Sequence, residues 1–262
     1  MKLSEENYYS QKANKEFLSC SQIKDFIKCE YAALAKLNGE YEEEPSNALI
    51  QSSYIDEYFS GTLENFKIQH GELFKKDGDL KAEYKGLDDI IKQAEEDSMF
   101  AKYLKGEHQV IMTGKIANSP VKIKMDSYFK DKVIVDLKAV KDFDLLWDEK
   151  EKIKKNFIDY YDYIMQAAIY QEIVYQNTGK KLPFIIAAMT KEKISERALL
   201  YIPQEKMDEK LGYVSEMISH IQELKNGNIL PSKCNHCDYC KSKAKTSKII
   251  DYSIYFDERG GI

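Results

Sequence analysis

The sequence predicts an α/β or α+β fold in which a central mixed sheet is flanked by helices. Three observations support this fold class. Apolar residues recur at helical spacing through roughly the first hundred residues. Residues 109–140 then have the pattern of three successive strands. A helix, two further strands and a last helix follow, an order typical of a sheet with covered faces.

The three predicted helices of the N-terminal part have recognisable ends. They cover about 22–37, 47–59 and 87–104. Ser21 is the expected N-cap of the first helix, which stops at Asn38 and Gly39. Pro45 closes an acidic loop before the second helix, and Gly61 ends that helix.

Polar turns separate the predicted central strands. These strands cover 109–117, 121–129 and 132–140 and should form a meander. Lys130, Asp131 and Lys132 make up its second turn. The later elements are a helix over 157–176, strands over 182–190 and 198–202, and a helix over 206–224.

Length and composition indicate a single globular domain, residues 1–262, with appendages. The 262 residues are 43% hydrophobic and 32% charged. We expect a core over about 20–226, a cysteine-rich knuckle over about 229–245 and a polar tail over 247–262. No apolar run approaches the ~20 residues of a membrane span, and the N-terminus lacks the apolar core of a signal peptide. These features predict a cytoplasmic protein with no membrane partner.

The basic residues point to a particular way of contacting nucleic acid. The net charge of −5 argues against a protein that binds nucleic acid over its whole surface, but not against a local basic channel. Arg197 and Arg259 are the only arginines, so the other non-histidine basic residues are all lysines. Arginine is the usual bidentate reader of guanine, whereas lysine contacts phosphate as a point charge. DNA would therefore be read through its backbone rather than its sequence.

Two aspartates and a lysine form the main candidate site. Asp136 and Lys138 are two residues apart on a predicted strand, so their side chains share a face. In a hairpin with a three-residue loop centred on Asp131, Asp126 comes directly opposite Asp136. The two carboxylates would repel each other unless a cation lies between them. They form a hard oxygen site for Mg²⁺ or Mn²⁺, beside a lysine that can activate water or stabilise charge on phosphate.

The alternative for these charges is a solvated strand face. Asp-x-Lys is a frequent sequence, and a strand with alternating charges on its outer face would contain it by chance. The apolar run Val133-Ile134-Val135 favours an interior strand instead, where charged side chains need a purpose.

A second pair of polar residues lies in the long helix predicted over 157–176. Gln166 and Tyr170 are four residues apart and hence share a helix face. They could hold a phosphate or orient Lys138 through hydrogen bonds. The alternative is an ordinary polar stripe.

The five cysteines suggest a metal site rather than disulfides. An odd number without a secretory signal disfavours a disulfide framework. Cys234, Cys237 and Cys240 fall within seven residues, a spacing typical of metal ligands. Cys20 is interpreted as a small packing residue.

In this order and spacing, Asp126, Asp136-Leu137-Lys138 and Gln166-x-x-x-Tyr170 resemble the motifs of the PD-(D/E)xK nucleases. The similarity is to the branch that holds exodeoxyribonuclease VIII and related phage and prophage exonucleases. It implies a restriction-endonuclease-like core. It further implies that Asp126 and Asp136 bind a metal with help from the Leu137 carbonyl, and that Lys138 is catalytic.

One departure from the family pattern concerns a metal ligand. Members of this family often carry a histidine ligand on an early helix, and Asp56 stands in the corresponding place here. An aspartate can also bind Mg²⁺, so Asp56 is a further candidate ligand. Glu107 is a weaker one and is more easily explained as a solvated strand end.

Relatives of this nuclease class also carry a four-cysteine iron–sulfur site, with one early cysteine and three near the C-terminus. By this resemblance Cys29 would join Cys234, Cys237 and Cys240. The gap between the last two cysteines is shorter than in those relatives. Zinc is therefore the alternative, with His236 or Cys29 as the fourth ligand.

The resemblance implies a Mg²⁺-dependent exonuclease that acts on double-stranded DNA ends in a bacterial or phage-infected cell. Such enzymes pass their DNA product to a single-strand annealing protein in recombination. Some of them form ring-shaped homo-oligomers. Two other functions fit the same residues. One is a DNA-binding or scaffold module that kept the fold without catalysis, and the other is a structure-specific endonuclease.

Overall fold

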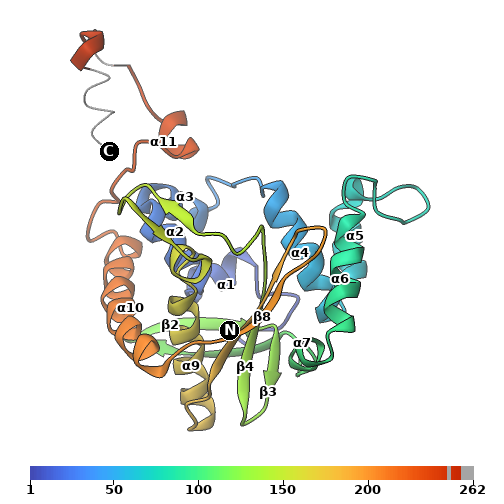
Figure 1. Ribbon diagram of the computed structural model, residues 1–262. Helices are drawn as coiled ribbons and strands as arrows, with labels where there is room; N and C mark the ends of the chain where they lie inside the picture. Colours follow the sequence, from blue (N-terminus) through green and yellow to red (C-terminus); the bar gives the residue numbers. More distant parts are fainter. Residues whose placement is uncertain (247–248, 255–262) are drawn as a thin grey trace.

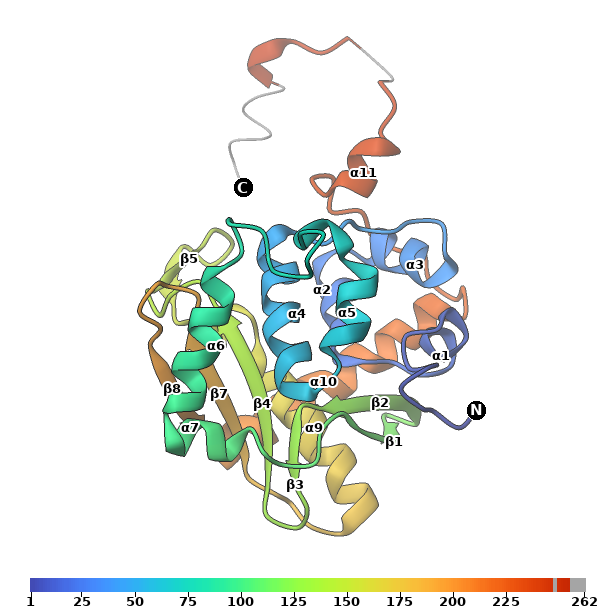
Figure 2. The ribbon, with the colours of Figure 1, turned by 90° about the vertical axis from the view of Figure 1, so that its right-hand side faces the viewer.

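The computed structural model describes residues 1–246 and 249–254, and its centre is a four-stranded mixed sheet (Figures 1 and 2). The strand order is β3-β4-β7-β8, in which β4 and β7 are parallel and the two outer pairings are antiparallel. The strands are β3 (Ser127–Phe129), β4 (Val133–Val140), β7 (Phe184–Thr190) and β8 (Arg197–Tyr201). The predicted central mixed sheet flanked by helices is confirmed.

Helices pack on both faces of this sheet and give β4 two buried faces. On one face, α9 (Tyr163–Thr178) and α10 (Gln204–Lys225) share a core with Ile134. On the other face, α4 (Asn47–Ser60) and α6 (Gly86–Glu96) share a core with Val135 and Leu137. Because side chains alternate along a strand, Asp136 and Lys138 lie on the same side of β4 as Ile134, toward α9. The expectation of an interior strand is confirmed.

The hairpin that joins β3 to β4 has the expected register. Ser127 pairs with Val135 and Phe129 pairs with Val133, around a loop of three residues. Asp131 in this loop has a positive φ of 63°. Continued by one residue, the pairing places Asp126 across from Asp136.

The predicted three-stranded meander is wrong, because the chain changes sheets at Asp126. The strand expected over 121–129 is two strands, β2 (Ser119–Met125) and β3, with a bend at Asp126 between them. β2 pairs with β1 (Val110–Ile116) in a separate two-stranded sheet. The Asp126 carboxylate accepts a hydrogen bond from the backbone N–H of Leu137, so the bend turns this side chain toward β4.

Three of the predicted helices are each two helices. The region predicted as 22–37 is α2 (Cys20–Lys28) and α3 (Glu30–Asn38), the region 87–104 is α6 and α7 (Ser98–Tyr103), and the region 157–176 is α8 (Phe157–Tyr160) and α9. Cys29 has extended backbone angles and separates the first pair. Asp97 and Asp162 separate the others, and each caps the helix that follows it. The N-cap of α2 is Ser19, with Gln22 completing a capping box, and not Ser21.

Several short elements were not expected from the sequence. They are α1 (Gln11–Glu16), α5 (Leu63–Gln69), the 3₁₀ turn Gly71–Leu73, β5 (Leu146–Asp148), β6 (Ile153–Lys155) and α11 (Asp238–Ser242). Each is too short to show a hydrophobic period. Among the described residues, no helix has both the length and the apolar character needed to cross a membrane. Most of the tail expected over 247–262, including Arg259, lies outside the described residues.

Candidate active site

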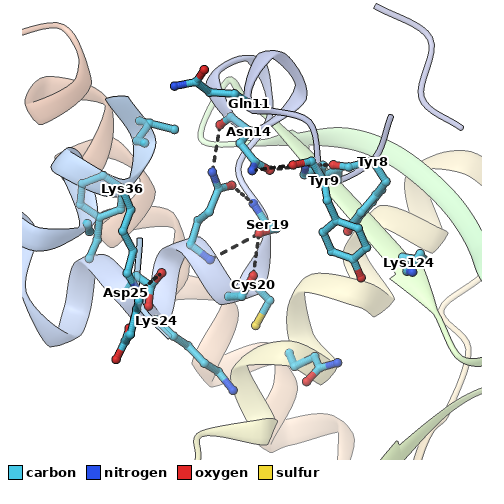
Figure 3. Close-up of a pocket in the computed structure, with 18 of the residues that line it drawn as sticks. Tyr8, Tyr9, Gln11, Asn14, Ser19, Cys20, Lys24, Asp25, Lys36 and Lys124 are labelled. Atoms are coloured by element: carbon cyan, nitrogen blue, oxygen red, sulfur yellow. Dashed lines mark hydrogen bonds and ion pairs between the residues drawn. The ribbon is translucent and has the colours of Figure 1, made fainter. Parts of the chain in front are cut away.

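One cavity of about 880 Å³ collects six of the seven side chains that the sequence singled out for DNA chemistry. It opens between the N-terminal helices and the surface formed by β2, β4 and α9 (Figure 3). The six are Asp56 from α4, Asp126 from the bend after β2, Asp136 and Lys138 from β4, and Gln166 and Tyr170 from α9. Glu107 does not line this cavity; it pairs with Tyr128 in an isolated β-bridge.

Asp136 is held from two sides. Its side chain is almost fully buried, with the whole residue 2% exposed. Gln166 donates a hydrogen bond from Nε2 to Asp136 Oδ1 at 2.6 Å, and the Lys138 ammonium forms an ion pair with Asp136 Oδ2. The glutamine therefore fixes the orientation of the carboxylate, while the lysine supplies its counter-charge.

Lys138 stays protonated in this setting. Burial lowers the pKa of its ammonium, but the negative charges of Asp136 and Asp126 outweigh burial and hold the pKa above its ordinary value. The ammonium also donates to the Leu137 carbonyl at 3.2 Å and lies 5.1 Å from the centre of the Tyr163 ring. A permanent cation suits the stabilisation of charge on phosphate better than it suits proton abstraction.

The carboxylates of Asp126 and Asp56 are disfavoured as anions. Burial, followed by the charge of Asp136, raises the pKa of Asp126 to about 7. Burial and the charge of Asp126 raise the pKa of Asp56 well above its ordinary value. Within the described part of the chain, Asp56 Oδ1 is buried and finds no hydrogen-bond partner. Three carboxylates that line one cavity, with buried oxygens of Asp56 and Asp136 that accept no hydrogen bond from the described residues, fit a hard divalent cation such as Mg²⁺ or Mn²⁺.

Tyr170 has a bridging position in the cavity wall. Its hydroxyl donates to the Lys124 carbonyl at 3.0 Å, which ties α9 to β2. Of the Gln-x-x-x-Tyr pair, Gln166 therefore contacts the carboxylate directly and Tyr170 holds the strand that leads into Asp126.

Basic and aromatic side chains that the sequence did not single out also line this cavity. Lys122, only 1% exposed, donates to Asn14 Oδ1 at 2.7 Å and to the Tyr8 carbonyl, and burial lowers its pKa to about 8. The Lys124 ammonium lies 4.7 Å from the Tyr9 ring centre. The spacing of Lys122, Lys124 and Asp126 could have revealed the two lysines, because alternate residues of a strand share a face.

Lysines line both sides of the cavity. Figure 3 shows Lys24 and Lys36 on the wall formed by the N-terminal helices, with Tyr8, Tyr9 and Lys124 on the opposite side. Tyr9 is 69% exposed, so its ring is accessible from solvent. Asp25 and Glu43 also line the cavity, and both form ion pairs with Lys36. The cavity thus combines lysines, tyrosines and acidic side chains.

The four candidate cysteine ligands also come together, away from the carboxylates. The sulfurs of Cys29, Cys234, Cys237 and Cys240 all lie within 4.8 Å of one another. His236 is not part of this group, so Cys29 is the residue that joins the three C-terminal cysteines. Cys20 is buried in the main core, as expected.

Comparisons with known proteins agree with this geometry. The family described as "PDDEXK-like domain of unknown function (DUF3799)" matches residues 19–243. A crystal structure described as that of a "putative exonuclease" from Eubacterium rectale is 42% identical. It superposes with a TM-score of 0.91 over 97% of this chain and 98% of the other. The crystal structure of SSO0001 aligns over 87% of this chain and 96% of the other, at 11% identity and a TM-score of 0.34. No curated protein matches the sequence.

Proposed function

Because the chain belongs to the family of PDDEXK-like domains, whose fold is that of a nuclease, we propose that it is a metal-dependent deoxyribonuclease. The finer proposal is an exonuclease that hydrolyses double-stranded DNA from its ends. The metal-dependent hydrolysis is proposed because Asp56, Asp126 and Asp136 line the same cavity as Lys138. The name of the Eubacterium rectale structure supports the exonuclease class.

Asp56, Asp126, Asp136 and the Leu137 carbonyl would hold Mg²⁺ or Mn²⁺. When bound, the metal would supply Lewis acidity and a stronger water nucleophile. Lys138 would stabilise the charge that develops on the phosphate, since its ammonium stays protonated. Gln166 would keep Asp136 aimed into the cavity. The unsatisfied oxygen of Asp56 argues against an inactive scaffold, because nothing in such a scaffold would offset the cost of three clustered carboxylates.

The proposal includes further partners and a second metal centre. The exonuclease would act in phage-type recombination in a bacterial or phage-infected cell. There it would pass its DNA product to a single-strand annealing protein. It would also assemble as a homo-oligomer, which light scattering would detect. The four cysteines would bind either an iron–sulfur cluster or zinc, because thiolates accept both.

Digestion of matched linear and covalently closed circular DNA tests the proposal. With Mg²⁺ we expect loss of the linear form alone, and EDTA should abolish it. Cleavage of the closed circle would instead identify an endonuclease. Binding of both forms without hydrolysis, in Mg²⁺ or Mn²⁺, would favour the scaffold function.

Tyr9 offers a test of how the DNA strand is held. An exposed ring beside the Lys124 ammonium suits stacking of a base next to a backbone phosphate. We expect Tyr9→Ala to raise KM for DNA by about tenfold, since a stacked base contributes ~1–3 kcal/mol, and to leave kcat nearly unchanged. Tyr9→Phe should behave as wild type, and so should Tyr201→Ala, a control at an exposed tyrosine outside the cavity lining. An unchanged KM in Tyr9→Ala would rule out this contact.

A further inference from the structure

The four clustered cysteine sulfurs are spaced for a single metal ion. Cys29 Sγ lies 3.6 Å from Cys240 Sγ and 3.8 Å from Cys237 Sγ, and Cys234 Sγ lies 3.9 Å from Cys240 Sγ. A tetrahedral zinc ion with Zn–S bonds of about 2.3 Å separates its ligand sulfurs by about 3.8 Å. We propose that Cys29, Cys234, Cys237 and Cys240 together bind one zinc ion.

An iron–sulfur cube does not fit the same residues. Each cysteine of a [4Fe–4S] cluster binds a different iron at a corner of the cube, so the four ligand sulfurs stand roughly 6 Å apart. Here no pair of the four sulfurs is separated by more than 4.8 Å. The cluster implied by resemblance to other nucleases is therefore replaced by a more compact centre in this chain.

Backbone hydrogen bonds support thiolate ligands at this site. The N–H of Cys237 donates to Cys234 Sγ at 3.3 Å, and the N–H of Cys240 donates to Cys237 Sγ at 3.4 Å. Donors aimed at sulfur favour its anionic form, which is the form that binds metal. The two-residue gaps between these cysteines produce both hydrogen bonds.

The zinc ion would have a structural role, because four protein ligands leave no open position for a substrate. Cys29 lies in the break between α2 and α3, and the other three ligands lie on or just before α11 (Figure 2). A helix of five residues does not persist by itself in water. Apart from the cysteines, its main anchor is Tyr239, whose ring packs between those of Tyr31 and Tyr41.

The metal would also stabilise one wall of the active-site cavity. The pocket beside Cys29, Cys234 and Cys237 shares Asp25 and Lys36 with the larger cavity that holds the carboxylates. Fixing the corner between α2 and α3 thus fixes the wall on which these residues lie. This role is independent of the catalytic proposal, and its test is independent as well.

The experiment is a metal analysis of the full chain, purified under nitrogen without a metal-binding tag from cells supplied with iron and zinc. We expect about one zinc ion per chain. We expect no acid-labile sulfide and no visible absorption band. Exchange of the bound metal for Co²⁺ in the wild-type protein should produce the sulfur-to-cobalt charge-transfer bands of a tetrathiolate site. Iron with sulfide, iron alone, or no metal would each overturn the assignment.

Variants locate the ion. Cys29→Ser and Cys234→Ser should lose the zinc, whereas Cys20→Ser, a buried cysteine outside the group, should keep it. His236→Ala should also keep it, and loss of zinc there would contradict the four-cysteine assignment. Asp136→Asn should retain the full zinc content. Loss in that variant would place the ion at the carboxylates instead.

Discussion

Replacement of Lys138 by methionine is expected to slow DNA hydrolysis by about 10²- to 10³-fold while divalent-cation binding persists. The ammonium is the only cation paired with Asp136 among the described residues, and it remains protonated beside the carboxylates. Methionine keeps the length of the side chain but removes the charge that would face the phosphate. Single-turnover rates at saturating DNA and Mg²⁺ should show the loss in kcat, and the Mg²⁺-induced rise in melting temperature should remain.

Lys138→Arg separates the two roles that a lysine can have here. An arginine keeps a permanent positive charge but does not act as a general base, because it does not deprotonate at working pH. If charge stabilisation is the role, the arginine variant should retain measurable activity and exceed the methionine variant. Equal inactivity of both variants would instead favour proton abstraction by Lys138.

Replacement of Asp56 by asparagine is expected to have opposite effects on activity and stability. Loss of one metal ligand should reduce hydrolysis at limiting Mg²⁺ on the order of 10²-fold. The same change should raise the melting temperature of the EDTA-treated protein at pH 8 by about 2–4 °C, the shift produced by about 1 kcal/mol in a domain of this size. The reason is that burial and the charge of Asp126 make the Asp56 side chain costly as an anion, whereas asparagine carries no charge.

The pH dependence of this stabilisation checks its cause. The folded-state pKa of Asp56 is raised, so ionisation of Asp56 destabilises the folded protein as pH increases above the unfolded-state pKa near 4. The gain from Asp56→Asn should therefore be larger at pH 8 than at pH 5. Differential scanning calorimetry in EDTA, with Asp144→Asn at an exposed position as a matched control, measures it. An equal gain at both pH values would show that the charge of Asp56 is not the cause.

The positions of the candidate site residues were predictable because they depend on local rules. Alternation along a strand places Asp136 and Lys138 on one face, and hairpin symmetry about Asp131 places Asp126 opposite Asp136. Both rules need only the positions of neighbouring residues in the chain. The fold class was predictable for the same reason, because changes in the hydrophobic period marked most of the larger helices and strands.

The remaining features depend on contacts between distant segments. No local pattern shows that Tyr8 and Tyr9 reach the cavity, because α1 is placed by its packing rather than by its own period. Similarly, α2 and α3 form one continuous helical pattern, and the break at Cys29 brings that sulfur to the three C-terminal cysteines. Such features are invisible to a reading based on periodicity alone.

The three-residue turn between β3 and β4 has a consequence for how this protein can evolve. Its residues are exposed and touch no part of the carboxylate site, so their identity is weakly constrained except at Asp131, whose positive φ favours glycine, asparagine or aspartate. Their number is not, because inserting or deleting one residue shifts the register and sends Asp126 to the opposite face from Asp136. A library of functional variants would thus accept many residues at 130 and 132, favour glycine, asparagine or aspartate at 131, and reject almost every change of length. For catalysis, the number of residues in this surface turn matters more than their identity.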